Sequence, residues 1–349
     1  MINLLLLLLS VSKTFTIRIF AEERPPQVVI SSTQGTYRIK VANDSLLLVN
    51  GKRERYFQQM EATRYTITAG EIKRRYAGGF TFYASEGELV ILNYIPEEDY
   101  LASVVAAEMP EGGAEARKAQ AIVARAYAYN KMGGHDVGYD LLDSQDSQVY
   151  RGLPTDSASL QAVRETEGLV LGYKGEIAEV YYHSTCGGMT LLPSDLWEGA
   201  KDRPYHRRRI DTLCCNSPFY VWDDTFRLDS LVFNLGLDVP IDSIHLVRRS
   251  DTALTPVKGF VFYAPDSSFF AYNEVVNLLD HRPKTRRFEA EISDNLLLIH
   301  GHGYGHGVGM CQFGAMALDK AGYNYRDILS YYFPGTEILA LSRISKGVK

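Results

Sequence analysis

The sequence lacks several features that would place it in a common class of proteins. It has no excess of positive charge: the formal net charge is −5, so no general basic field is available to attract nucleic acid. Beyond the N-terminal apolar run, no stretch is long enough to span a bilayer as a helix. Its glycine-rich segment lacks the Gly-Lys-Ser/Thr of a Walker loop, which argues against a P-loop nucleotide site.

What is present is an ordinary globular composition. The chain has 349 residues, of which 46% are hydrophobic and 23% charged. This length allows one large or two ordinary domains, and the apolar content is sufficient for a proper core.

The N-terminus carries a short apolar run, residues 4–9, followed by the small residues Ser10-Val11-Ser12. We interpret residues 1–12 as a signal segment cut near Ser12, although no Lys or Arg precedes the run. A wrongly assigned start codon or a buried first strand are the alternatives. A signal predicts an exported protein of the cell envelope or periplasm.

Cysteine is scarce, and no C-x-x-C pair occurs among Cys186, Cys214, Cys215 and Cys311. In an exported protein a disulfide is expected. Because a bridge between vicinal cysteines is strained, Cys214 or Cys215 is expected to pair with Cys186. In a cytosolic protein all four would be free thiols.

Residues 13–95 predict a β-rich region with no catalytic pattern. Short alternating segments separated by Ser, Gly and Asn turn signals are typical of a small β-sandwich or barrel. These segments are 14–20, 28–30, 37–41, 46–49, 65–68, 80–83 and 89–92.

Residues 96–132 predict two helices joined at a break. Pro96 and the acidic residues 97–99 are typical of a helix N-terminus, and Pro110 ends that helix. The second helix is expected from about Ala114 to Met132. We therefore predict an α+β fold, in which the β-rich region precedes a mixed α/β domain with a central helical pair. That domain spans residues 96–340, and residues 191–290 within it are a candidate insertion.

Glu108 is the strongest candidate for a chemical role. It falls at the end of the first helix after small apolar residues, where a carboxyl group can have a raised pKa and act as an acid and then as a base. Lys118 and Arg125 are seven residues apart, on one face of the second helix, and could hold polar groups of a ligand. The alternative is a structural ion pair between Glu108 and Arg125.

The loop at 135–152 contains Asp136, Asp140, Asp143 and Asp146, which invite a calcium interpretation. The spacing of an EF-hand is absent, so we expect a solvated loop.

A predicted strand ending at Tyr182 leads into the turn 183–188, and such turns often carry functional sites. Neighbouring residues of an extended chain point to opposite faces, so His183 is not expected to activate Ser184. Cys186 as a nucleophile beside a histidine is an alternative to its pairing in a disulfide.

A stretch rich in histidine and glycine, residues 300–309, precedes a helix expected from Met310 to Ala321. Its glycines allow close backbone approach, and its N–H groups could cradle an anion. Histidines in this stretch also suggest zinc, but they lie on a loop rather than on one helix face, so we favour no metal there.

Four separated motifs together resemble the SpoIID/LytB family. In order, they are DYLASVVAAEMP with KAQAIVARAYA, DSQDSQVYRG, YYHSTCGG, and GHGVGMCQFGA with ILSYYFPGT, over about residues 90–340. The resemblance implies a secreted bacterial cell-wall protein. The best-known member is a sporulation lytic transglycosylase, which cleaves the β-1,4 bond between N-acetylmuramic acid and N-acetylglucosamine in peptidoglycan strands stripped of stem peptides. It leaves a 1,6-anhydro sugar end.

By this resemblance Glu108 is the glutamate of the family's Glu-Met-Pro motif and the single general acid and base, with no cofactor; glycoside hydrolysis would usually need two carboxylates. The candidate glycan-binding residues implied by motif position are Lys118, Arg125, Tyr182, His183, Ser184, His302, His306, Gln312 and Tyr332. The implied partners are peptidoglycan glycan strands and a cell-wall amidase.

Two departures from the family pattern matter. Some members bind zinc through Cys and His residues ahead of Gln-Val-Tyr, where this chain has Leu142, Asp146 and Ser147, and His135 alone remains. We therefore predict no structural zinc in that loop. Cys311 stands where serine is usual and would pack as a small apolar residue.

The resemblance also leaves open a non-catalytic role known for other members, in which the protein binds glycan and stimulates an N-acetylmuramoyl-L-alanine amidase. A zinc amidase using His302 and His306 and a hydrolase using Cys186 are further alternatives.

Overall fold

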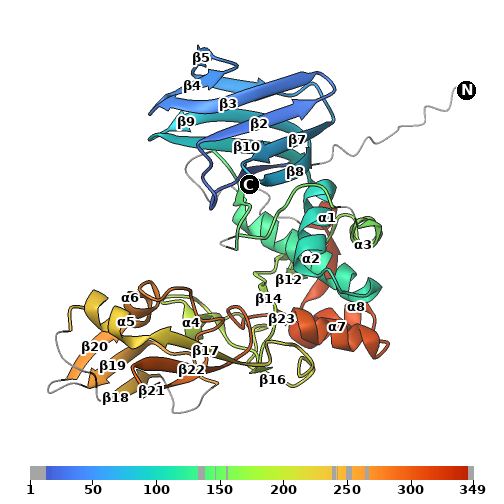
Figure 1. Ribbon diagram of the computed structural model, residues 1–349. Coiled ribbons are helices and arrows are strands. Elements are labelled where there is room, and N and C mark those ends of the chain that lie inside the picture. Colours follow the sequence, from blue (N-terminus) through green and yellow to red (C-terminus); the bar gives the residue numbers. More distant parts are fainter. Residues whose placement is uncertain are drawn as a thin grey trace, which may run out of the picture. The chain divides into compact units, whose positions relative to one another are not determined.

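The computed structural model describes residues 13–132, 138–145, 147–154, 156–237, 241, 243–248, 254–263 and 267–344 (Figure 1). The chain forms two compact units. The first comprises residues 1–178 together with 338–349, and the second comprises residues 179–337.

Two sheets form the β-rich part of the first unit (Figure 1). One has the order β11-β1-β10-β9-β6 and contains β1 (Thr14–Ile19), β6 (Tyr56–Gln59), β9 (Gly79–Ser85), β10 (Glu88–Pro96) and β11 (Leu141–Leu142). The other has the order β5-β4-β3-β2-β7-β8 and contains β2 (Gln27–Ser32), β3 (Gly35–Asn43), β4 (Leu46–Val49), β5 (Lys52–Glu54), β7 (Arg64–Ala69) and β8 (Ile72–Ala77).

The two sheets share one hydrophobic core, which makes this part a sandwich. In β1 the alternating residues Phe15 and Ile17 are fully buried, and they join Ile30 and Ile39 of the other sheet in the same cluster. The predicted β-rich N-terminal region is therefore confirmed. Alternation of apolar and polar residues produces it, because successive side chains of a strand point to opposite faces.

The central helical pair is also confirmed. It consists of α1 (Glu97–Glu108) and α2 (Ala114–Lys131), and both pack against α3 (Ser157–Glu165). Asp156 caps α3 by accepting the backbone N–H groups of Ala158 and Ser159. The alanines of α2 are small, which lets the surrounding elements approach closely.

A small sheet completes the first unit, with the order β13-β12-β24 for β12 (Leu169–Tyr173), β13 (Glu176–Ile177) and β24 (Glu337–Ala340). The sequence predicts a strand that ends at Tyr182, but β13 ends at Ile177. Beyond Ala178 the backbone partner changes, since the N–H of Glu179 donates to the hydroxyl of Tyr205. A 3-10 turn, η1 (Leu341–Arg343), follows β24.

The second unit contains two three-stranded sheets that enclose one core. They have the orders β17-β22-β21 and β18-β19-β20, with β17 (Val221–Arg227), β18 (Ser243–Val247), β19 (Gly259–Tyr263), β20 (Ser267–Ala271), β21 (Phe288–Ser293) and β22 (Leu296–His302). Helices α5 (Leu228–Asn234) and α6 (Tyr272–Val276) accompany them, and Trp222, Phe260 and Phe288 lie in the core.

The rest of the second unit is built from short elements. Strand β14 (Tyr182–His183) pairs in parallel with β23 (Met310–Cys311), and β15 (Gly188–Met189) pairs with β16 (Ile210–Asp211). The helices are α4 (Pro193–Leu196), α7 (Gln312–Lys320) and α8 (Tyr325–Tyr332). Helix α7 begins two residues later than predicted, because Met310 and Cys311 are held in β23.

None of the helices in the described ranges is long and apolar enough to cross a membrane. The segment interpreted as a signal, residues 1–12, lies outside the described residues, as do His135, Asp136 and Asp146.

Candidate functional site

Glu108 is the last residue of α1 and is half-buried. Its Oε1 accepts a hydrogen bond from the backbone N–H of Val149 at 3.0 Å. Val149 belongs to the Gln-Val-Tyr segment, which is distant in sequence but lies against the end of α1. The two motifs that the sequence shows separately therefore form one structural feature.

Side chains on both sides of Val149 fix this segment. The hydroxyl of Tyr100, on α1, donates to Oε1 of Gln148 at 3.0 Å. The hydroxyl of Tyr150 donates to Oδ1 of Asn93, on β10, at 2.7 Å. Tyr100, Gln148, Tyr150 and Asn93 are all buried. Buried hydrogen bonds to α1 and to the sandwich therefore fix the segment whose N–H group Glu108 accepts.

Lys118 lies on α2 and is held by two carboxylates. Its Nζ contacts Oε1 of Glu115 at 2.8 Å and Oε2 of Glu165 at 2.7 Å. These hydrogen bonds raise the pKa of Lys118. Part of the Lys118 side chain remains exposed, at 18%.

Arg125 is fully enclosed by protein. Its Nε donates to Glu97 at 2.7 Å and its Nη2 to Glu98 at 3.1 Å, while Nη1 donates to the carbonyl oxygens of Thr166 and Leu169. The side chain has no exposed surface. The ion pairs of Arg125 therefore go to the start of α1 rather than to Glu108, and they support a structural role instead of contact with a ligand.

His183 and Ser184 follow each other in the second unit and do not pair. Nδ1 of His183 donates to the carbonyl oxygen of Val308 at 3.1 Å, and the ring is buried. Burial is the main reason that the pKa of His183 lies well below its usual value. The hydroxyl of Ser184 lies 3.4 Å from that of Thr185. As expected from the extended chain, this is not a Ser-His hydrolase arrangement.

His306 belongs to an aromatic group that the sequence did not reveal. Its ring centroid lies 5.4 Å from that of Trp197 and 5.7 Å from that of His183, and Tyr181 lies 5.0 Å from Trp197. Burial lowers the pKa of His306 to about 4, so its ring is neutral near pH 7. Trp197 remains 37% exposed, and exposed indole and phenol rings suit the apolar faces of sugars.

A pocket of about 260 Å³ in the second unit includes Trp197 and His306 in its wall. Its remaining lining is strongly basic and contains Arg282, Lys284, Arg286 and Arg287. An aromatic wall beside several cations can bind a sugar that carries a carboxylate.

The other predicted residues of the second unit are less accessible. His302 ends β22 and is half-buried, and Tyr182, on β14, is half-buried as well. Gln312 is the first residue of α7 and is buried, and so is Tyr332, whose hydroxyl donates to Oδ2 of Asp211 at 2.8 Å.

Three N–H groups of the glycine-rich loop are already used within the protein and are not free for an anion. Those of Gly303, Tyr304 and Gly305 donate to backbone carbonyl oxygens of the surrounding segments. Gly309 has φ of +76°, and a Cβ there would lie 2.1 Å from the carbonyl oxygen of Tyr181. Gly309 therefore allows this loop to pack closely on the residue before β14.

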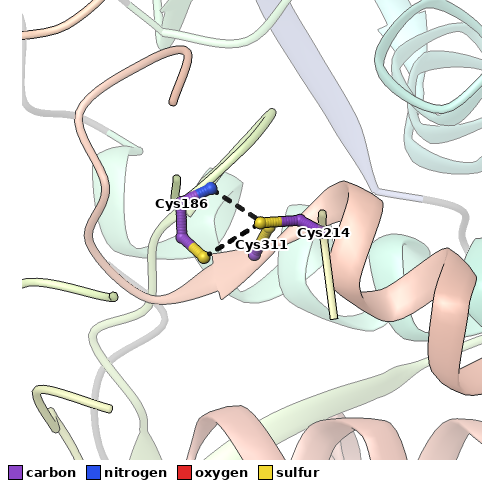
Figure 2. Close-up of side chains that lie close together, drawn as sticks. All are labelled: Cys186, Cys214 and Cys311. Carbon is purple, nitrogen blue, oxygen red and sulfur yellow. Dashed lines mark hydrogen bonds between the residues drawn. The ribbon is translucent and has the colours of Figure 1, made fainter. Parts of the chain in front are cut away.

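All four cysteines are free thiols in the structure. Cys214, rather than Cys215, lies beside Cys186, with an Sγ–Sγ distance of 3.3 Å, and Cys311 joins them (Figure 2). The expected Cys186 disulfide is therefore not formed here, and Cys311 does not pack simply as an apolar residue. Within the described residues Cys186 has sulfur and backbone partners rather than a histidine.

The histidines of the glycine-rich stretch do not form a metal site among the described residues, where Cys186, Cys214 and Cys311 are the one group of three candidate ligands. His300 instead pairs with Asp223 at 2.6 Å. In the loop ahead of Gln-Val-Tyr, the backbone N–H of Leu142 donates to the hydroxyl of Ser147.

The expectation of a solvated loop at 135–152 is wrong for Asp143. This residue is buried and accepts the backbone N–H groups of Phe20 and Ala21. Asp140 similarly accepts the N–H of Thr16. Both aspartates therefore tie the loop to the end of the first sheet.

The predicted residues thus fall into two sets. Glu108, Lys118 and Arg125 belong to the first unit, and the other candidates belong to the second. Sequence reasoning missed Gln148 and Val149 as supports of Glu108, although the Gln-Val-Tyr motif contained them. It also missed Trp197. The available signal was the scarcity of tryptophan, since the chain has only two.

Comparisons with known proteins agree with the motifs. Residues 85–173 match the model of a family described as Stage II sporulation protein. The chain is 28% identical to an uncharacterized protein of Brachyspira hyodysenteriae, over 78% of this chain and 74% of that protein. It is 28% identical to an amidase enhancer of Bacillus subtilis, over 87% of this chain, and spans half the length of that protein. It is 29% identical to a stage II sporulation protein D of Bacillus subtilis, over 70% of this chain and 74% of that protein.

Proposed function

Because these matches confirm the resemblance to the SpoIID/LytB family, we propose that the chain is a peptidoglycan lytic transglycosylase with Glu108 as its single general acid and base. The proposed substrate is the β-1,4 bond between N-acetylmuramic acid and N-acetylglucosamine in glycan strands. The proposed place of action is outside the cytoplasm, in the cell envelope.

In the proposed reaction, protonated Glu108 gives its proton to the glycosidic oxygen as the bond to the muramic acid C1 breaks. The resulting carboxylate then takes the proton of the muramic C6 hydroxyl, whose oxygen forms the new bond to C1. The products are a free N-acetylglucosamine hydroxyl and a 1,6-anhydro-muramic acid end. Glu108 is protonated again at the end, so one carboxyl group and no water suffice.

The observation that carries this proposal is the placement of Glu108. It lies half-buried at the end of a buried helix and accepts the N–H of Val149, whose segment is fixed by Tyr100 and Asn93. A group held in this way is positioned before the substrate arrives, which lowers the entropic cost of catalysis.

Carboxylates on α1, α2 and α3 support a mechanism with one acid. Glu97 and Glu98 are paired with Arg125, and Glu115 and Glu165 are paired with Lys118. Groups held in ion pairs are poor candidates for the second carboxylate of a hydrolase.

The pocket beside Trp197 supports glycan binding by the second unit. Muramic acid in strands without stem peptides carries a free carboxylate on its lactyl group. Arg282 and Lys284 line the pocket and would attract this carboxylate, while Trp197 would contact the face of a sugar ring.

The second candidate function is non-catalytic: binding of glycan and stimulation of a cell-wall amidase. The specific observation in its favour is the match to an amidase enhancer over 87% of this chain. A protein with this function would need the pocket of the second unit but not the carboxyl group of Glu108.

The deciding experiment is mass spectrometry of the soluble products released from peptide-free glycan strands by the purified protein, Glu108→Gln and Glu111→Gln. Glutamine retains an oxygen acceptor for the N–H of Val149, so Glu108→Gln should fold normally. Glu111 is an exposed carboxylate three residues further on and serves as the matched control.

We expect products ending in 1,6-anhydro-muramic acid from the wild type and from Glu111→Gln, and none from Glu108→Gln. Products with reducing ends would instead show hydrolysis and a second carboxylate. Absence of products, with co-sedimentation of protein and glycan and a faster amidase reaction, would establish the amidase-stimulating function.

A further inference from the structure

Three cysteines from separate parts of the chain meet inside the second unit. Cys186 lies in the turn after β14, Cys214 lies just after β16, and Cys311 ends β23 and caps α7. All three are buried, and their sulfur atoms lie within 4.8 Å of one another (Figure 2). The proposed reaction uses none of them.

The spacing of the sulfur atoms suits ligands of one metal ion. Cys186 and Cys214 are separated by 3.3 Å, well beyond the roughly 2.05 Å of a disulfide. Three thiolates at about 2.3 Å from a tetrahedral zinc ion lie about 3.8 Å apart. Only small side-chain movements are needed to reach that geometry from the one observed.

Two backbone N–H groups point at the sulfur atom of Cys311 and favour its thiolate. Sγ of Cys311 accepts from the N–H of Cys186 at 3.3 Å and of Gly314, in the first turn of α7, at 3.4 Å. Donors of this kind, together with a helix N-terminus, stabilise the deprotonated form that binds metals.

Arg287 provides an independent indication that negative charge belongs here. Its side chain is buried, with 1% of its surface exposed, and Nη1 donates to the carbonyl oxygen of Met189. Its Nη2 is buried and has no hydrogen-bond partner among the described residues. Burial lowers the pKa of Arg287, and Cys186, Cys311 and Cys214 each act to raise it, so all three lie within its electrostatic reach. A buried, incompletely bonded cation beside three thiols is costly unless charge of opposite sign accompanies it.

We propose that Cys186, Cys214 and Cys311 bind a thiophilic divalent metal ion, with Zn²⁺ as the expected ion, and that the Arg287 guanidinium balances the remaining negative charge. A divalent cation and one guanidinium together neutralise three thiolates. The structure shows no fourth His, Cys, Asp or Glu ligand in this group within the described ranges, so the fourth position falls to solvent or to a small external ligand. This site is separate from the loop ahead of Gln-Val-Tyr.

The metal would join the turn after β14, the segment after β16 and the start of α7. His183 and Asp211 directly precede two of these segments and Gln312 begins α7, and Asp211 holds Tyr332. Loss of the metal is therefore expected to loosen one side of the second unit, which is a structural role and independent of the proposed reaction.

The first test needs no variant. Reduced, metal-free protein is titrated with Co²⁺ and with Cd²⁺, and the thiolate-to-metal charge-transfer absorption is recorded, followed by competition with Zn²⁺. We expect saturation at one equivalent and full displacement by Zn²⁺. Zinc should also raise the Tm of the metal-free protein in proportion to the logarithm of its concentration above Kd.

The second test compares Cys186→Ser, Cys214→Ser and Cys311→Ser with Cys215→Ser. Cys215 is exposed and adjacent in sequence but outside the group, which makes it the matched control. We expect the charge-transfer absorption to fall in the first three variants and to remain in Cys215→Ser. Because a serine variant could fail to fold, circular dichroism accompanies each spectrum, and the titration of the wild type decides alone if folding is lost.

Two results would overturn the proposal. One is the absence of thiolate-to-metal absorption in the reduced, folded wild type. The other is a stable Cys186–Cys214 disulfide in the protein purified from its native compartment, found by peptide mapping without reduction.

Discussion

Arg125 and Glu97 form an ion pair of 2.7 Å in which the arginine side chain has no contact with solvent. Replacing Arg125 with Met would leave Glu97 as a buried carboxylate without its cation. Removal of one partner of a buried pair typically costs about 3–5 kcal/mol. We therefore expect Arg125→Met to lower the free energy of unfolding by about that amount, as measured by urea denaturation.

Lys118→Met is the control for this change, because Lys118 is also a paired cation on α2 but is partly exposed. Exposed pairs contribute about 0–1 kcal/mol. If Arg125→Met were as mild as Lys118→Met while glycan binding disappeared, Arg125 would be a ligand-binding residue and the structural assignment would fail.

Tyr150→Phe should weaken the support of Glu108. The change removes the hydroxyl that donates to Asn93 at 2.7 Å and leaves a buried amide oxygen without this donor. The expected loss of stability is about 1–3 kcal/mol. Tyr56→Phe, at a side chain that is 63% exposed, is the control and should change the free energy of unfolding very little.

If glycan cleavage is confirmed, Tyr150→Phe should also reduce kcat more than KM, since the Val149 segment positions Glu108. Equal stability of Tyr150→Phe and the wild type would argue against this chain of contacts.

The stability of the protein should fall in acid because of His306. Burial lowers the pKa of this residue to about 4 from 6.5, so the folded state keeps the ring neutral where the unfolded chain takes up a proton. Between these values the unfolded state binds more protons, and stability decreases as the pH is lowered. The expected contribution of His306 is at most about 3 kcal/mol.

The measurement is urea denaturation near pH 7 and near pH 4.5, for the wild type and for His306→Gln. The variant should lose less stability between the two pH values than the wild type. His245→Gln, at an exposed histidine of β18, should retain the wild-type difference. If His306→Gln lost as much stability between the two pH values as the wild type, the prediction would be wrong.

Gly309→Ala should be strongly destabilising, because the added Cβ would lie 2.1 Å from a backbone oxygen that cannot easily move. Gly236 has a similar φ, +70°, but its added Cβ would meet nothing within 4 Å. Gly236→Ala should therefore show only the cost of placing alanine in the left-handed backbone conformation, about 1–3 kcal/mol. Thermal denaturation should show a clearly lower Tm for Gly309→Ala, and equal Tm values would show that the loop relaxes.

The parts of the fold that the sequence predicted are those with local signals. Pro96 and Pro110 bound α1, and alternation in 14–20 marks β1, because both effects act within a few residues. Helix α8 was missed even though Asn324 and Asp327 form a capping box at its start. Its buried residues are only Ile328, Leu329 and Tyr332, and three positions in a short helix give a weak periodic signal.

The sequence predicted the parts of the site that lie within one motif, and missed the contacts between motifs. Glu108 follows from its place at the helix end, but its contact with Val149 joins positions separated by a loop. Arg125 shares a face with Lys118, yet the sequence could not show that Glu97 and Glu98 cover its guanidinium. The closeness of Cys186 to one vicinal cysteine was foreseeable although no disulfide joins them, whereas the approach of Cys311 depends on the parallel pairing of β14 with β23.

The order of strands β13-β12-β24 has a consequence for how the protein is made. Its outer strands flank β12, but 159 residues of the second unit separate them in the chain. During synthesis the sandwich and helices α1–α3 are complete long before β24 leaves the ribosome. Until then the edge of β12 that receives β24 has no strand partner from this sheet. The nascent first unit therefore exposes an open strand edge, at which a chaperone or a second nascent chain can bind.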